Sequence, residues 1–147
     1  MARSWAPVDA NLRILNGNTT AVTADDDNGL ADLILEIGSG RFDARLFYDV
    51  TAIDITSADE QYDIIVQGSN SATFASGIQE LGRMKLGHTS TRKGAISSVI
   101  GRYEISFSNE VVNTEYRYLR VLVDVTGTTP SITIRNMWVT LEFGGIA

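Results

Sequence analysis

The fold class is clearest in one stretch near the carboxyl end of the chain, Tyr118-Leu119-Arg120-Val121-Leu122-Val123-Asp124-Val125. Its apolar face consists of alternate residues, namely Leu119, Val121, Val123 and Val125. Successive side chains of a β-strand point to opposite faces of the sheet, whereas an amphipathic helix repeats every 3.6 residues. The stretch therefore predicts a strand with one face buried in a core.

The same two-residue period recurs on both sides of this stretch. It appears in residues 33–37, 42–50, 62–66, 103–107 and 131–143, with a less regular segment around 81–86. Clusters of Gly, Asn, Asp and Ser separate these segments, and no run has a convincing helical period. The pattern predicts an all-β protein, an antiparallel two-sheet jelly-roll sandwich of about eight strands. Periodicity alone does not separate it from an immunoglobulin-like sandwich.

A chain of 147 residues fits one domain of this kind. We expect residues 20–147 to form the sandwich and residues 1–19, which are less patterned, to form an N-terminal arm or extended segment. That segment is either a frayed terminus or an arm that becomes ordered on a partner, and its Trp5 favours a contact.

The final segment, from about Ser131 to Phe143, has apolar residues on both faces. Strict alternation places Ile132 and Ile134 with Trp138, and Met137 on the opposite side. Two apolar faces are typical of a central strand or of a strand that contacts a partner. Met137 and Trp138 are therefore our candidates for self-association.

Composition excludes several classes of function. The net charge of −6 opposes non-specific binding to nucleic acid. Without cysteine, the chain has no disulfide, thiolate metal site or cysteine nucleophile. The amino-terminal residues do not match a signal peptide and no stretch matches a membrane span, so we expect synthesis in the cytoplasm and no membrane partner.

Catalytic motifs are also missing. His88 is the only histidine, and it lies in a polar, glycine-punctuated loop. Asp54, Asp59 and Glu60 cluster in another loop, where two carboxylates in a pocket would suit glycoside hydrolysis, but such clusters usually make a turn soluble. The run Asp25-Asp26-Asp27-Asn28-Gly29 suggests a cation loop, yet it lacks EF-hand spacing and suits a turn. We expect no enzyme activity, no cofactor and no metal.

Positive charge concentrates in the middle of this acidic chain, on Arg83, Lys85, His88, Arg92 and Lys93. The segment lacks interleaved aromatic residues on which bases could stack. It is either a solvated loop or a surface that docks on an acidic protein. With Trp5 of the arm, these residues are our candidates for docking.

One stretch resembles a known group of proteins. It runs from Asp54 to Asn70 and contains Ser57-Ala58-Asp59-Glu60, Tyr62-Asp63 and Gln67-Gly68-Ser69, followed by Phe74. These features, with Tyr116–Val121 and Ser131–Ile134, resemble the small capsid cement proteins of tailed bacteriophages. The resemblance covers roughly residues 30 to 143 and includes no catalytic motif.

The resemblance implies a jelly-roll subunit on the exterior of an icosahedral virion, assembled in the cytoplasm of a bacterial host. Such a subunit would form a homo-dimer or homo-trimer and bridge neighbouring major capsid proteins. The alternative is a carbohydrate-binding module or a phage receptor-binding or fibre domain. It would need exposed aromatic rings, for which the candidates are Trp5, Phe47, Tyr48, Tyr116, Tyr118 and Trp138.

Overall fold

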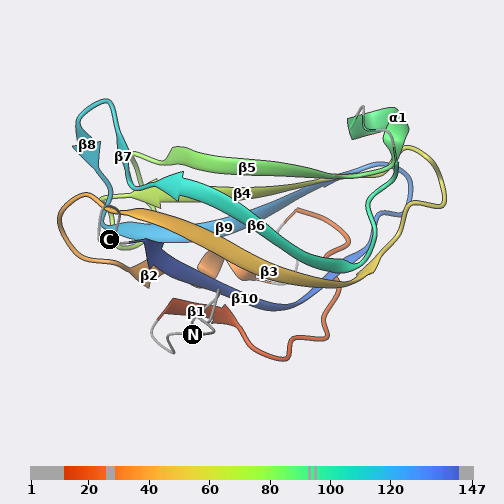
Figure 1. The fold of residues 1–147 in the computed structure, drawn as a ribbon, viewed down its shortest axis with the longest axis horizontal. Helices are drawn as coiled ribbons and strands as arrows, with labels where there is room; N and C mark the ends of the chain where they lie inside the picture. Colours follow the sequence, from red (N-terminus) through yellow and green to blue (C-terminus); the bar gives the residue numbers. More distant parts are fainter. Residues whose placement is uncertain (1–11, 26–28, 93, 95, 143–147) are drawn as a thin grey trace, which may run out of the picture.

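The computed structural model describes residues 12–25, 29–92, 94 and 96–142. Two four-stranded antiparallel sheets pack face to face, with a short hairpin at one end and a single turn of helix at the other (Figure 1). The elements are β1 (Arg13–Leu15), the 3-10 helix η2 (Leu30–Asp32), β2 (Leu35–Glu36), β3 (Asp43–Ile53), β4 (Gln61–Ser69), β5 (Gln79–Gly87), α1 (Thr89–Arg92), β6 (Gly101–Ser108), β7 (Glu110–Val111), β8 (Thr114–Glu115), β9 (Tyr118–Thr126) and β10 (Ile132–Glu142).

The strand order confirms the jelly roll. One sheet has the order β1-β10-β3-β6 and the other β2-β9-β4-β5, while β7 and β8 pair only with each other. Each sheet therefore joins strands from the beginning and the end of the chain, as two interleaved Greek keys require. The eight sheet strands match the number expected, and the β7–β8 hairpin is an extra excursion between β6 and β9.

The core lies between the sheets and consists of the alternate residues that the sequence singles out. Leu46 and Tyr48 of β3, Ile64 of β4, and Val121 and Val123 of β9 are each at most 1% exposed. They face one another across the sandwich because each strand turns its period-two apolar face inward. The inward faces predicted for these strands are confirmed.

The final strand differs from strict alternation. Its pairing with β3 skips Arg135, so one extra residue bulges out of β10 at that point. The bulge reverses the alternation, and Ile134 and Met137 both face the core, with exposures of 1% and 0%. Our placement of Ile132 and Ile134 on the face of Trp138 is therefore wrong. β10 is a central strand between β1 and β3, which is one of the two explanations offered for its apolar faces.

The amino-terminal part of the sandwich also differs from expectation. β1 is the edge strand beside β10, and its Ile14 is buried in the core, so the sandwich begins before residue 20. Of the expected strand at 33–37, only Leu35 and Glu36 pair as β2 with β9. The preceding residues form η2, which Gly29 starts at a left-handed φ of 71°. Within the described residues, no helix has the length and apolar character needed to cross a membrane.

Candidate functional site

The loop between β5 and β6 stands at one end of the sandwich, at the right of Figure 1. We call residues 88–100 the α1 loop. Its first half rests on the turn before β4: the backbone N–H of His88 donates to the carbonyl of Glu60 at 3.1 Å, and the hydroxyl of Thr91 donates to the same carbonyl at 2.8 Å. The hydroxyl of Ser90 donates to the carbonyl of Ala58. α1 is therefore fixed to the framework although it has only one turn.

The second half of the α1 loop is fastened as well. Ser98 is 5% exposed and exchanges two hydrogen bonds with Gly87, the last residue of β5: its hydroxyl accepts from the Gly87 N–H at 3.0 Å, and its N–H donates to the Gly87 carbonyl at 2.9 Å. The hydroxyl of Tyr103 donates to the carbonyl of Val99 at 2.6 Å. Hydrogen bonds to β5, to β6 and to the turn before β4 hold the described residues of the loop, which reduces the conformational entropy that they would lose on binding.

Three large apolar side chains project from this ordered segment. Ile96, Val99 and Ile100 are 72%, 60% and 62% exposed, and we call them the apolar tip. Single exposed apolar residues are common on protein surfaces, but three within five residues of one loop are a concentration that is typical of contact surfaces. These side chains were not expected from the sequence, because residues 87–98 have a polar composition. A sign of their exposure in the sequence is that the β-branched residues at 96, 99 and 100 do not follow the two-residue alternation of a half-buried strand.

Positive charge lies next to the apolar tip. Arg92 ends α1 and donates from Nη1 to the carbonyl of Ile96 at 2.6 Å, which holds the two halves of the loop together. Among the described residues, no carboxylate forms an ion pair with Arg92. His88 is half-buried, with Nδ1 2.9 Å from the hydroxyl of Ser90. Lys93 and Trp5, the other expected contacts, lie outside the described residues.

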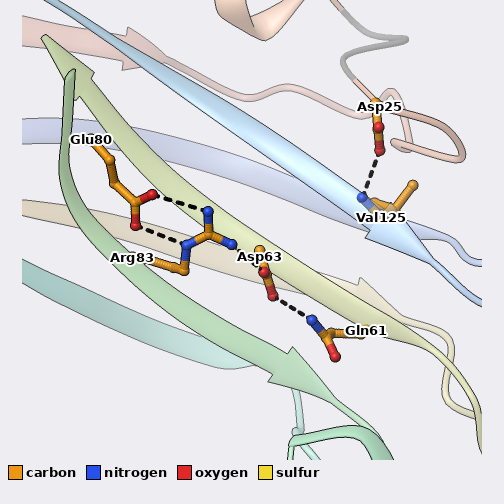
Figure 2. A network of polar contacts seen from close by, with 6 residues as sticks. All are labelled: Asp25, Gln61, Asp63, Glu80, Arg83 and Val125. Carbon is orange, nitrogen blue, oxygen red and sulfur yellow. Dashed lines mark hydrogen bonds and ion pairs between the residues drawn. The ribbon is translucent and has the colours of Figure 1, made fainter. Parts of the chain in front are cut away.

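Arg83 has a different position and a different role. It lies on the outer face of β5, where Nε and Nη2 donate to the two carboxylate oxygens of Glu80 at 2.8 and 3.0 Å, and Nη1 contacts Asp63 at 2.5 Å (Figure 2). The bidentate hydrogen bond to Glu80, followed by that to Asp63, raises the pKa of Arg83. The guanidinium is therefore occupied within the sheet, while the neighbouring Lys85 is exposed. Lys85, rather than Arg83, remains available beside the α1 loop.

The acidic turn below the α1 loop is held by hydrogen bonds to its own neighbours. Asp54 accepts from the N–H and hydroxyl of Thr56, and Asp59 accepts from the N–H and hydroxyl of Thr128. These hydrogen bonds lower the pKa of both carboxyl groups. Glu60 is fully buried, and its Oε1 accepts from the N–H of Ser57 at 2.7 Å. The three residues shape the turn that supports the loop.

The loop suspected of binding a cation contacts β9. Asp25 accepts from the N–H of Val125 at 2.8 Å, as Figure 2 shows; residues 26–28 lie outside the described residues. Burial and the adjacent Asp25 raise the pKa of Asp124. Among the described residues, no group of three carboxylates or histidines has a metal-binding arrangement.

The candidate self-association residues do not offer a surface. Met137 is completely buried and Trp138 is 4% exposed. The indole stacks on Phe47, with ring centroids 5.5 Å apart, and the Arg102 guanidinium lies 4.8 Å from the Trp138 ring centroid. Asp49 holds Arg102 in place through hydrogen bonds of 2.6 and 3.1 Å. The expectation that these two side chains meet a second copy is therefore corrected.

The same burial removes several rings as platforms for sugars. Phe47 and Trp138 are at most 7% exposed, and Tyr48 is completely buried. Tyr116 and Tyr118 are half-buried, and the Arg117 guanidinium lies over Tyr118.

Comparison with known proteins does not identify a family for this chain. No family model matches the sequence, and no curated protein matches it. A solved structure that is similar contains the CBM22-1–GH10 modules of the Clostridium thermocellum endo-1,4-beta-D-xylanase 10B, complexed with xylohexaose. The similarity has a TM-score of 0.38 and 13% identity, and it covers 73% of this chain and 18% of that chain. Because the TM-score is so low, no conclusion about fold or function rests on it.

Proposed function

We propose that this chain is a structural virion protein that binds the outer surface of a tailed-phage capsid and cements neighbouring major capsid subunits. The observation that carries the proposal is the apolar tip, Ile96, Val99 and Ile100, presented on a loop that is hydrogen-bonded to the framework, beside the guanidinium of Arg92. A surface of this kind suits docking on another protein, because its apolar area leaves water on contact and its order reduces the entropic cost.

The residues that resemble cement proteins support this surface directly. The Ser57–Glu60 turn supplies the carbonyls on which α1 rests. The hydroxyl of Tyr62 lies 2.6 Å from the carbonyl of Asp54 and accepts from the N–H of Ser131 at 2.9 Å, which joins that turn to the start of β10. One of the matching segments, Ser57–Glu60, therefore supports the α1 loop directly.

Charge suggests the chemistry of the capsid surface that is bound. The chain as a whole has a net charge of −6, so it repels an acidic partner on average. Lys85 and Arg92 reverse this locally. We infer a partner surface that is apolar at its centre with carboxylates around it, since such a surface would be attracted to this end of the sandwich and repelled by the rest.

A shell carries many copies of each contact, so modest affinity at each site adds up to a large gain in shell stability through multivalency. Each subunit would bridge neighbouring capsid subunits as a homo-dimer or homo-trimer. Self-association would use a surface other than Met137 and Trp138, which are buried.

The test is to mix the purified protein with phage capsid shells that lack it and to sediment the mixture. The proposal predicts saturable co-sedimentation and an increase in the temperature at which the shells rupture. If the protein stays in the supernatant, or binds without any change in rupture temperature, the cementing role is wrong.

A further inference from the structure

A polar pocket lies at the end of the sandwich opposite the α1 loop. It occupies about 400 Å³ and is lined by residues of the segment that follows β4 and of the β7–β8 hairpin and its flank. The hairpin lies on the left of Figure 1. Its described lining consists of neutral residues, Asn70, Ser71, Ser76, Gly77, Thr114 and Tyr116. The volume is within the roughly 300–1,000 Å³ of small-molecule sites. The described lining carries hydroxyl and amide groups, although somewhat more than half of its exposed surface is apolar.

The two walls of the pocket are tied together before any ligand binds. The side-chain amide of Asn70 donates to the carbonyl of Glu115 and accepts from the N–H of Arg117, each at 3.0 Å. One residue therefore connects the end of β4 to the strand on the other side of the pocket. The distance between the walls is set by the framework.

The first wall is anchored by a buried aromatic ring. Phe74 is 5% exposed, with the Arg120 guanidinium 4.5 Å from its ring centroid, and its φ of 54° is an uncommon conformation for a bulky residue. The hydroxyl of Ser69 donates to the carbonyl of Ser76 at 2.8 Å. Such strain persists only where the surroundings enforce it, and it clusters at functional sites.

The second wall is anchored by a buried amide. Asn109 is completely buried. Its side-chain Nδ2 donates to the carbonyl of Tyr116, and its backbone carbonyl accepts from the Tyr116 N–H at 2.8 Å. Gly68 of β4 lies so close that a Cβ at that position would be 2.9 Å from the Cβ of Tyr116. The half-buried ring of Tyr116 is therefore placed by its backbone at the edge of the pocket.

We propose that this pocket binds a neutral saccharide. Hydroxyl and amide groups can exchange hydrogen bonds with sugar hydroxyls, and a tyrosine ring can pack against the apolar C–H face of a sugar ring. A charged ligand would lose its hydration without finding an opposite charge in the lining. A purely apolar ligand would leave the polar lining groups without partners.

The pocket is independent of the docking surface. It lies beyond the far end of β4 and β9, whereas the α1 loop lies at their other end (Figure 1). A copy attached to a capsid through the α1 loop would keep the pocket open to the outside. The inference therefore goes beyond the proposed function and does not depend on it.

The test uses the full ¹⁵N-labelled chain and NMR titration with neutral oligosaccharides of glucose, galactose, mannose and N-acetylglucosamine, beside sialylated and sulfated ones. The proposal predicts saturable shifts for at least one neutral sugar, confined to residues 70–77 and 114–116. Thr114→Val and Tyr116→Ala should each weaken binding by about tenfold, the size expected for loss of a hydrogen-bonded hydroxyl or a packed ring. Tyr116→Ala keeps the Cβ that packs on Gly68.

Thr126→Val is the matched control, because Thr126 is an exposed threonine at the other end of β9, and it should bind like the wild type. The proposal is overturned if no neutral sugar causes shifts, if the shifts map elsewhere, if only charged sugars bind, or if both pocket variants retain full affinity. Co-sedimentation of the two pocket variants with shells separates this result from the capsid proposal, because both should still dock.

Discussion

Replacing the apolar tip with serine should weaken attachment to the capsid and leave the fold intact. Fully burying an Ile or Val side chain contributes about 1.5–3 kcal/mol. Since roughly two-thirds of each of Ile96, Val99 and Ile100 is exposed, burying all three would contribute about 3–6 kcal/mol. This energy corresponds to a change in Kd of about 10²–10⁴, with the lower end favoured if the interface stays partly hydrated.

The assay is a sedimentation titration of fluorescently labelled protein onto shells that lack it, with the triple variant beside the wild type. Urea unfolding of each protein checks the fold. We expect the free energy of unfolding to change by no more than about 0.5 kcal/mol, because these side chains are mostly exposed. Val112→Asn is the control, because Val112 is 89% exposed at the opposite end of the molecule. A folded triple variant with wild-type affinity would refute the role of the tip.

Three further predictions concern stability. Tyr62→Phe should cost about 1–3 kcal/mol in urea unfolding, because the buried hydroxyl has two backbone partners that would lose it; an unchanged midpoint would contradict this. Because the folded-state pKa of Asp124 is raised, its contribution to stability is fully present below the ordinary value of 3.8 and is lost as the pH rises through the folded value. Asp124→Asn should therefore stabilise the protein at neutral pH, through relief of desolvation and of repulsion from Asp25, with a gain that disappears below 3.8; a gain independent of pH would exclude this cause. Val112→Asn should raise the free energy of unfolding by about 1 kcal/mol, since Val112 has a φ of 47° in a two-residue turn that favours asparagine; a loss of stability would show that the turn is not strained.

Most of the sandwich was predictable because its long strands repeat with a single period. The inward residues of β3, β4 and β9 follow from alternation alone. The same rule failed in β10, because the extra residue at Arg135 reverses the faces, and a bulge leaves no mark in the hydrophobic pattern. It also failed at Leu33, where a 3-10 turn interrupts the alternation.

The proposed docking surface was predictable only in part. The position of His88 and Arg92 in a loop follows from the glycines and polar residues around them. The pairing of Arg83 with Glu80 joins residues three apart on β5, but its second partner, Asp63, is 20 residues away on another strand and could not be foreseen. The exposure of Ile96 contradicts the default that apolar residues point inward, so it does not follow from the sequence.

Hydrogen–deuterium exchange of the protein, free and bound to capsid shells, tests most directly where the molecule makes its contact. The account predicts slower exchange on binding in residues 88–100, and unchanged exchange in residues 70–77 and 112–116 at the opposite end. Protection confined to that opposite end, or an α1 loop that exchanges equally fast in both states, would contradict it.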